Sequence, residues 1–139
     1  MSELQYGLLS PELRPLIDKF YRAHGSTMRT ARGDGVRYWV ARRQGILGVL
    51  NLSPIEQGFW LTGLFVSHEE RGQGIGGRLL EHAVNHAASP VWLFCHPELV
   101  PFYQSSGFQT LAFLPESLSD KLRRYQQSKP LIALEYSPS

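Results

Sequence analysis

A glycine-rich segment at residues 71–77 restricts the possible folds of this chain more than any other feature. The segment, Arg-Gly-Gln-Gly-Ile-Gly-Gly, follows a β-like run at residues 58–66. It opens a stretch whose apolar residues recur at helical spacing, namely Ile75, Leu79, Leu80, Ala83 and Ala87. A continuous apolar run at residues 91–95 follows, which is typical of a strand covered on both faces. The sequence therefore predicts a strand, a glycine loop, a helix and a central strand in succession.

The rest of the chain adds short elements of both kinds. Further strands are expected at residues 4–9, 36–43, 46–52, 108–113 and 131–136. Further helices are expected at residues 11–24, 97–105 and 117–127. The three runs between residues 36 and 66 are separated by Gln44-Gly45 and by residues 53–57, which favours an antiparallel meander. We expect an α/β fold in one domain over residues 1–139, with a mixed, mostly antiparallel sheet of about seven strands and about four helices.

Composition and charge argue against several classes of protein. The longest apolar run, residues 91–95, is far shorter than the roughly 20 residues that cross a bilayer, and residues 1–4 lack the features of a secretory signal. A single cysteine, Cys95, allows no internal disulfide and suits a reducing cytoplasm. The net charge is only +2 and the arginines are scattered. We expect a cytoplasmic protein that binds neither membranes nor nucleic acids.

The glycine segment predicts a binding site for phosphate groups. Glycines let a ligand approach the backbone, and the first N–H groups of the following helix have no partner within the helix. A glycine turn with no ligand is the alternative. Gly72, Gly74 and Gly77 also fit the dinucleotide pattern G-x-G-x-x-G, with Glu98 about 20 residues further on. However, residues 67–71 separate the loop from the strand, the preceding elements are antiparallel, and too few residues remain for a second nucleotide-binding half.

These residues resemble the GNAT superfamily of N-acetyltransferases, which use acetyl-coenzyme A (acetyl-CoA). The family signature is Arg or Gln, two residues, Gly, one residue, then Gly or Ala, and Arg71, Gly74 and Gly76 match it. The strand at residues 61–66 precedes it, and residues 101–108 look like the family segment F-Y-x-x-x-G-F. The resemblance implies a GNAT-like fold, acetyl-CoA as co-substrate without a metal, and acetyl transfer to a primary amine by direct attack in a ternary complex.

The resemblance also implies roles for individual residues. Backbone amides of the loop would hold the pyrophosphate, at Arg71, Gly72, Gln73, Gly74, Ile75, Gly76 and Gly77. The pantetheine arm would pair with Leu64, Phe65 and Val66, next to a bulge that the sequence does not locate. A backbone N–H near Leu64 or Phe65 would polarise the thioester carbonyl. Tyr103 would act as general acid toward the departing thiolate, although an aromatic residue beside Phe102 is also typical of a core. His96 stands where the family often has a cofactor-contacting asparagine.

The general base is the main departure from the family pattern. Many members carry an acid on the fourth strand, where this chain has Trp60-Leu61-Thr62-Gly63. A base would act through water, come from His68, Glu69, Glu70 or His96, or be unnecessary for an amine of low pKa. The missing acid leaves a second hypothesis, a non-catalytic acyl-CoA sensor or partner-binding module.

The partners implied by the resemblance are less specific than the donor. The acceptor would be a small molecule or a peptide amine, in a site lined by residues 21–35 and 115–130, and a homodimer is an open expectation because many members dimerise. His82 and His86 lie one helical turn apart but lack the glutamate of a metalloprotease motif, so a solvated helix edge is favoured over a metal site.

Overall fold

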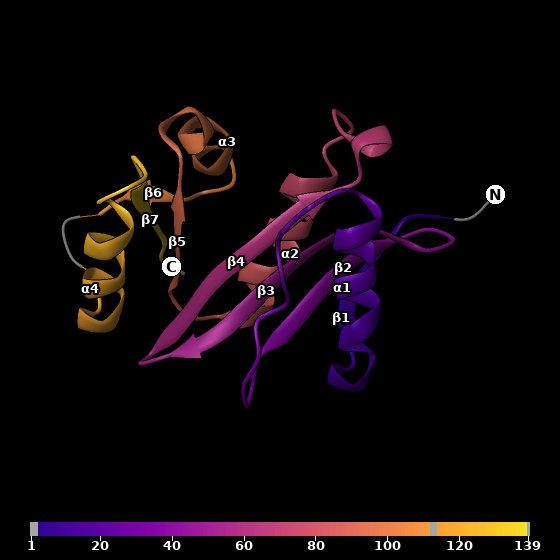
Figure 1. Ribbon diagram of the computed structural model, residues 1–139, viewed down its shortest axis with the longest axis horizontal. Helices are drawn as coiled ribbons and strands as arrows, with labels where there is room; N and C mark the ends of the chain where they lie inside the picture. The colour runs from indigo at the N-terminus through magenta and orange to yellow at the C-terminus, as the bar shows by residue number, and fades with distance from the viewer. Residues whose placement is uncertain (1–2, 112–113, 139) are drawn as a thin grey trace.

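The computed structural model describes residues 3–111 and 114–138 of the chain. Within them one sheet contains seven strands, β1 (Gln5–Leu9), β2 (Arg37–Arg42), β3 (Ile46–Ile55), β4 (Gly58–Val66), β5 (Val91–Cys95), β6 (Gln109–Thr110) and β7 (Ile132–Tyr136) (Figure 1). The α-helices of the same residues are α1 (Arg14–Ala23), α2 (Ile75–Ala87), α3 (Val100–Gln104) and α4 (Glu116–Tyr125). Short 3-10 turns occur at η1 (Pro11–Leu13), η2 (His68–Glu70) and η3 (Pro97–Leu99). The predicted mixed α/β architecture is confirmed.

The sheet divides into two parts that meet at a short parallel contact. Its strand order is β1-β2-β3-β4-β5-β7-β6, and of the adjacent pairs in the described residues β4 and β5 alone are parallel. That contact joins Phe59 to Val91 and Trp60 to Trp92, after which the two strands diverge (Figure 1). The edge of β4 that faces β5 therefore has no strand partner from residue 61 onward within the described part of the chain. The interior position predicted for β5 is confirmed.

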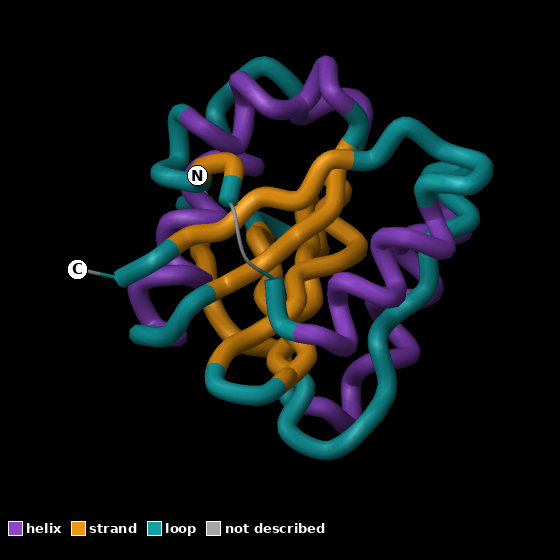
Figure 2. The backbone as a smooth tube through the Cα atoms, turned by 90° about the vertical axis from the view of Figure 1, so that its left-hand side faces the viewer, coloured by secondary structure: helices purple, strands orange, loops and turns teal. Residues whose placement is uncertain are grey.

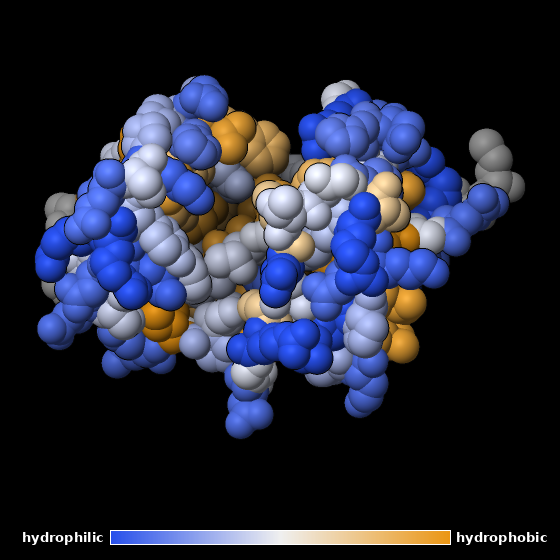
Figure 3. All heavy atoms as spheres, viewed as in Figure 1, coloured by the Kyte–Doolittle hydropathy of each residue, from blue (hydrophilic) through white to orange (hydrophobic). Residues whose placement is uncertain are grey.

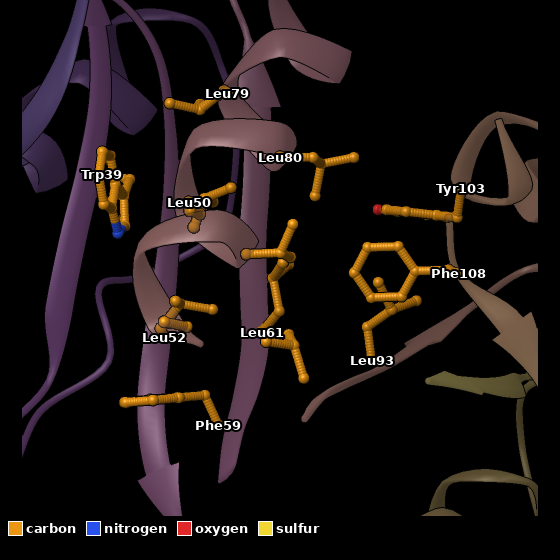
Figure 4. Close-up of a cluster of buried hydrophobic side chains, with 14 of the residues drawn as sticks. Trp39, Leu50, Leu52, Phe59, Leu61, Leu79, Leu80, Leu93, Tyr103 and Phe108 are labelled. Atoms are coloured by element: carbon orange, nitrogen blue, oxygen red, sulfur yellow. The ribbon is translucent and has the colours of Figure 1, made fainter. Parts of the chain in front are cut away.

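Helices cover both faces of the sheet (Figure 2). Leu79 and Leu80 of α2 are fully buried and pack with Leu50 and Leu61 of the sheet (Figure 4). A fully buried leucine side chain stabilises the fold by about 1.5–3 kcal/mol. On the other face α1 buries Ile17, with Phe20 and Tyr21, against β2 and β3. The helical spacing seen from residue 75 thus marks the face of α2 that packs into the core.

β3 and β6 differ in their bounds from the strands that the sequence predicts, and the helices predicted at 11–24 and 97–105 each begin with a 3-10 turn, η1 and η3. β3 continues to Ile55, so the connection to β4 is Glu56-Gln57 rather than residues 53–57, and Glu56 adopts the positive φ of a two-residue hairpin turn. Pro54 is tolerated within β3 because pairing with β2 ends at Leu52, and proline suits a strand segment with one free side. Of the strand predicted at 108–113, the structure shows β6, and residues 112–113 lie outside the described residues.

None of the helices in the described ranges is long and apolar enough to cross a membrane.

Candidate active site

β4 carries a bulge at Gly63 and Leu64. Between the pairs Asn51–Thr62 and Val49–Phe65, β4 uses one residue more than β3. Gly63 has φ 69°, in the left-handed region that favours glycine. A Cβ atom at Gly63 would lie 2.5 Å from the hydroxyl of Tyr21 and 2.7 Å from Nδ2 of Asn51. Both the backbone conformation and the neighbouring atoms therefore require glycine here, immediately before the predicted pantetheine-binding residues.

A buried polar network supports this bulge. The Tyr21 hydroxyl donates a hydrogen bond to the Gly63 carbonyl at 2.6 Å. Asn51, which is fully buried, donates from Nδ2 to the Tyr21 oxygen at 3.1 Å and to the Thr62 carbonyl at 3.3 Å. Its Oδ1 accepts the N–H of Ala31 at 2.9 Å. The network therefore connects the bulge to α1 and to the loop that follows α1.

The sequence placed Tyr21 only in the segment 21–35 expected to line an acceptor site, and it gave Asn51 no role. The available signal was one amide side chain inside the apolar run 46–52, because a buried amide needs hydrogen-bond partners. That signal does not say where the partners are.

The glycine loop leads from η2 into the N-terminus of α2. Gly74 is the N-cap residue with φ 80°, and no side chain caps the helix. The first N–H groups of α2, at Ile75, Gly76 and Gly77, have no partner within the helix and carry its positive dipole end. A Cβ at Gly72 or Gly74 would meet no atom within 4 Å, so the space over the loop is open. This arrangement can bind an anion through backbone groups.

A cavity of about 450 Å³, the glycine-loop cavity, lies between the end of β4, this loop and α3. Figure 3 shows the hollow between the two parts of the molecule, with apolar residues on its floor. The predicted site residues that line the cavity are Leu64, Phe65, Val66, Arg71, Gly72, Gly74, Ile75, Gly76, Gly77 and Tyr103. Gln73 and His96 are exposed and do not line it. The structure thus brings most of the predicted donor-binding residues around one hollow.

The cavity wall also includes residues that the sequence did not place there, Glu70, Leu99 and Phe102. Leu99 is 44% exposed and Phe102 39%, so both present apolar surface to the cavity that they line. The Phe102 ring would lie 3.2 Å from a Cβ at Gly76, so glycine there lets the ring approach the helix. Phe102 directly precedes Tyr103 and Leu99 stands four residues before it, and this proximity was the signal available in the sequence.

Tyr103 reaches from α3 toward α2, with its hydroxyl directed away from its own helix (Figure 4). The ring makes edge-on contacts with Phe102 and Phe108, at 5.0 and 5.8 Å between ring centroids. Burial, with a smaller contribution from Cys95, raises the pKa of Tyr103 to about 12. The phenol is therefore a neutral hydrogen-bond donor at physiological pH. Tyr103 belongs to the core and lines the cavity as well, so the two interpretations of its sequence context do not exclude each other.

A second hollow, the aromatic pocket, has a volume of about 440 Å³. Residues 60–63 of β4 line it, whereas residues 64–66 line the glycine-loop cavity, so the two hollows share β4 and adjoin at the bulge. Trp60 contacts Phe94 of β5 at 5.8 Å between ring centroids, and Phe94 contacts Tyr125 of α4 at 6.1 Å. The aromatic pocket is also lined by Met28 and Arg29 from the loop after α1, and by Lys129 and Leu131 from the segment after α4. The pocket draws on both segments that the resemblance suggested for an acceptor.

The candidate bases lie elsewhere. His68 and Glu69 are exposed in η2, where the Glu69 carboxylate is 4.0 Å from Nε2 of His24. Glu70 lines the glycine-loop cavity and lies 3.8 Å from the Arg43 guanidinium. Among the described residues that line the aromatic pocket there is no carboxylate and no imidazole. Deprotonation by a side chain of that pocket therefore has no candidate of either type.

His82 and His86 each contact an aromatic ring. His82 stacks on Tyr6 at 4.9 Å, and His86 meets Trp39 edge-on at 5.4 Å. No group of three or more potential metal ligands occurs among residues 3–111 and 114–138.

Comparison with known families identifies the central part of the chain. The family model described as acetyltransferase (GNAT) domain matches residues 34–110. No curated protein matches the sequence.

Solved structures show the same fold. The ribosomal-protein-S18-alanine N-acetyltransferase of Escherichia coli is 14% identical and superimposes with a TM-score of 0.73, covering 99% of this chain and 95% of that one. The GNAT family N-acetyltransferase YhbS of E. coli, solved in complex with CoA, is 16% identical with a TM-score of 0.69, covering 99% and 82%. ElaA of E. coli is 18% identical with a TM-score of 0.67, covering 99% and 100%. At these identities the likeness concerns the fold.

Proposed function

The chain belongs to the acetyltransferase (GNAT) domain family, and on this premise we propose that it transfers the acetyl group of acetyl-CoA to a primary amine in a ternary complex. One observation carries the proposal. An open cavity at an uncapped helix N-terminus and a separate aromatic pocket are lined by consecutive residues of β4 and adjoin at its bulge. A donor and an acceptor bound in these two hollows would meet beside Gly63 and Leu64.

The glycine-loop cavity fits CoA by its chemistry. The N–H groups at the start of α2 suit the pyrophosphate, because they are not capped by a side chain and the space above Gly72 and Gly74 is open. The unpartnered edge of β4 at residues 64–66 suits the amide-bearing pantetheine arm, which can pair with it as an added strand. Leu99 and Phe102 provide an apolar wall along that path.

Acetyl-CoA supplies an activated acetyl group as a thioester. A backbone N–H of Leu64 or Phe65 would donate to the thioester carbonyl as negative charge develops on its oxygen. The general-acid role expected for Tyr103 would take the form of a hydrogen bond donated to the departing sulfur. Because the phenol pKa is about 12, above the roughly 8.5 of a thiol, Tyr103 stabilises the thiolate by hydrogen bonding as the carbon–sulfur bond breaks, and solvent completes its protonation.

The acceptor must be a neutral amine when it attacks. The aromatic pocket contains Arg29 and Lys129 and, in its described lining, no acid, so it disfavours an ammonium ion and lowers the pKa of a bound amine. The bound ammonium would therefore lose one proton to water before it attacks. As the neutral nitrogen adds to the carbonyl carbon it would release a second proton to water, and the carbonyl would re-form as the carbon–sulfur bond breaks and the thiolate leaves. This accounts for a fourth strand without a carboxylate.

Replacement of Tyr103 by phenylalanine tests the proposed catalysis. Tyr103→Phe should lower kcat about 100-fold, because the hydrogen bond to the leaving thiolate is lost. The Kd for acetyl-CoA should change less than about threefold, since the phenol supplies little of the donor-binding surface. Thiol release with a panel of primary amines measures kcat, and calorimetry measures Kd. An unchanged kcat would remove Tyr103 from the mechanism.

The lack of an acid or imidazole in the aromatic pocket is also what a non-catalytic sensor would show. Tight binding of acetyl-CoA by the wild-type protein, with no thiol release from any amine in the panel at pH 7 to 9, would favour that second function.

A further inference from the structure

The walls of the aromatic pocket combine aromatic rings with cationic side chains. Trp60, Phe94 and Tyr125 form a continuous run of ring contacts. Arg29 and Lys129 line the same pocket from two loops that lie far apart in the sequence. Such a lining suits a ligand that has an apolar or aromatic body and a negatively charged group.

The two cations are available to a ligand. Neither Arg29 nor Lys129 forms an ion pair within 4 Å among the described residues. On α4, the Asp120 carboxylate is paired with the Arg123 guanidinium at 3.4 Å. No carboxylate of the described residues therefore neutralises Arg29 or Lys129 through an ion pair.

Hydrogen bonds hold the Arg29 loop in position. The N–H and the hydroxyl of Thr30 both donate to the Asp18 carboxylate at 3.1 Å. The Tyr38 hydroxyl donates to the Ala31 carbonyl at 2.6 Å. Together with the bond from the Ala31 N–H to Asn51, these contacts fix the backbone immediately after Arg29. A preorganised loop loses less conformational entropy when its arginine binds a ligand.

Aromatic rings can also attract cations, but here the protein supplies the cation itself. The Lys121 ammonium lies 4.6 Å from the centre of the Trp60 ring and 6.0 Å from that of Tyr125. A cationic ligand group in the aromatic pocket would be repelled by Arg29 and Lys129, which line it.

We infer that the acceptor is a primary amine that carries an anionic group, a carboxylate or a phosphate, on an apolar or aromatic body. Arg29 and Lys129 bind the anion, and Trp60, Phe94 and Tyr125 contact the body. The inference rests on the proposed acetyl transfer, because it names the acceptor class of the same site.

Matched pairs of amines test the inference. Phenylalanine is compared with phenethylamine, which lacks the carboxylate, and tyramine O-phosphate with tyramine, which lacks the phosphate. The kcat/KM for thiol release from acetyl-CoA is measured for each amine. Binding to the CoA-saturated protein is measured separately by calorimetry. At least one anionic member should exceed its neutral partner about tenfold or more in kcat/KM and in affinity. Comparison of the two pairs identifies the anion.

Variants that remove one positive charge test which residues bind the anionic group. Arg29→Gln and Lys129→Gln should each reduce the anionic-to-neutral ratio by about tenfold. Arg124→Gln is the matched control, because it removes one charge from exposed α4 at a residue that does not line the pocket, and it should leave the ratio unchanged.

The outcomes separate the inference from the proposed function. Thiol release with equal or better use of the neutral amines would overturn the inference and leave acetyl transfer in place. Preferential binding of anionic amines without thiol release would retain the anion site and overturn the catalysis. If the protein shows no preference for binding anionic amines and no thiol release with any amine, both the inference and the proposed function are overturned.

Discussion

Gly63 is the residue at which the backbone, the buried network and the two hollows come together. Its positive φ permits the bulge, and its carbonyl accepts the hydrogen bond of Tyr21. The residues before the bulge line the aromatic pocket, and those after it line the glycine-loop cavity. A change at this position therefore alters the alignment of donor and acceptor even though glycine offers no side chain for chemistry.

Substitution of Gly63 by alanine should destabilise the protein strongly. A methyl group would combine the cost of the left-handed backbone, about 1–2 kcal/mol, with displacement of Tyr21 and Asn51. We expect the free energy of unfolding to fall by about 3 kcal/mol, measured by urea denaturation. Gly25→Ala is the matched control, because Gly25 has φ 70° and open space around a Cβ, and it should lose about 1 kcal/mol. Equal losses for the two variants would show that the network yields without cost.

At the residue scale the sequence pointed to residues that line the glycine-loop cavity more readily than to those that support the bulge. Arg71, Gly74 and Tyr103 were named from the sequence because they match motifs of the family that the chain resembles, and all three line the glycine-loop cavity. Tyr21 and Asn51 were not, because their hydrogen bonds join residues 30 and 42 positions apart in the chain. Local spacing carries no information about such pairs.

Among the elements, α2 matters most for the proposed function because of how it begins. Its first turn contains Gly76 and Gly77, has no acidic residue and has no side-chain cap. Glycines lower helix propensity at these positions by roughly 1 kcal/mol each relative to alanine. The buried face of Leu79, Leu80 and Val84 compensates for this, so the helix can start with a bare backbone.

A negative charge at the N-terminus of α2 should weaken donor binding. Gly74→Glu places a carboxylate where a pyrophosphate is proposed to lie. Gly74→Gln has nearly the same size and the same backbone strain without the charge. Acetyl-CoA should bind the Glu variant about tenfold or more weakly than the Gln variant, as measured by calorimetry at low salt. Equal affinities would place the phosphates away from this helix end.

Periodicity predicted most elements, but it did not predict where β4 and β5 separate. Both strands continue past the last parallel pair, Trp60 with Trp92, without any break in their sequence pattern. Side chains from α3, such as Tyr103, lie beside the hollow that opens there. A feature made by packing between distant elements leaves no mark in the pattern of a single strand. The antiparallel connection between β3 and β4 was predicted but made too long, at residues 53–57 instead of Glu56-Gln57, because Pro54 is a common strand terminator.

At the scale of the whole molecule, one divergence in the sheet creates both hollows. β1 to β4 with α1 and α2 form one part, and β5 to β7 with α3 and α4 form the other (Figure 1). Each hollow takes residues from both parts, so the site depends on how the parts pack across β4 and β5. Two buried tyrosines support this arrangement, since Tyr103 packs with residues of both parts and Tyr21 holds the β4 bulge through its hydrogen bond to the Gly63 carbonyl.

Their ionisation should make the fold sensitive to alkali. Burial raises the pKa of both phenols from 10 to about 12, so between these pH values the folded chain retains protons that the unfolded chain has lost. Stability is therefore fully present below pH 10 and declines as the pH rises toward 12, by about 2 kcal/mol for each tyrosine. The free energy of unfolding, measured by urea denaturation at pH 8 to 11.5, should show this decline. Tyr21→Phe and Tyr103→Phe should each reduce the loss of unfolding free energy between pH 10 and 11.5 by the contribution of one phenol, and the double variant should remove both contributions. This holds whatever each substitution costs in stability at neutral pH. A wild-type stability that stays level from pH 10 to 11.5 would show that the two phenols ionise as readily in the folded chain as in the unfolded one, and that the junction between the two parts admits water.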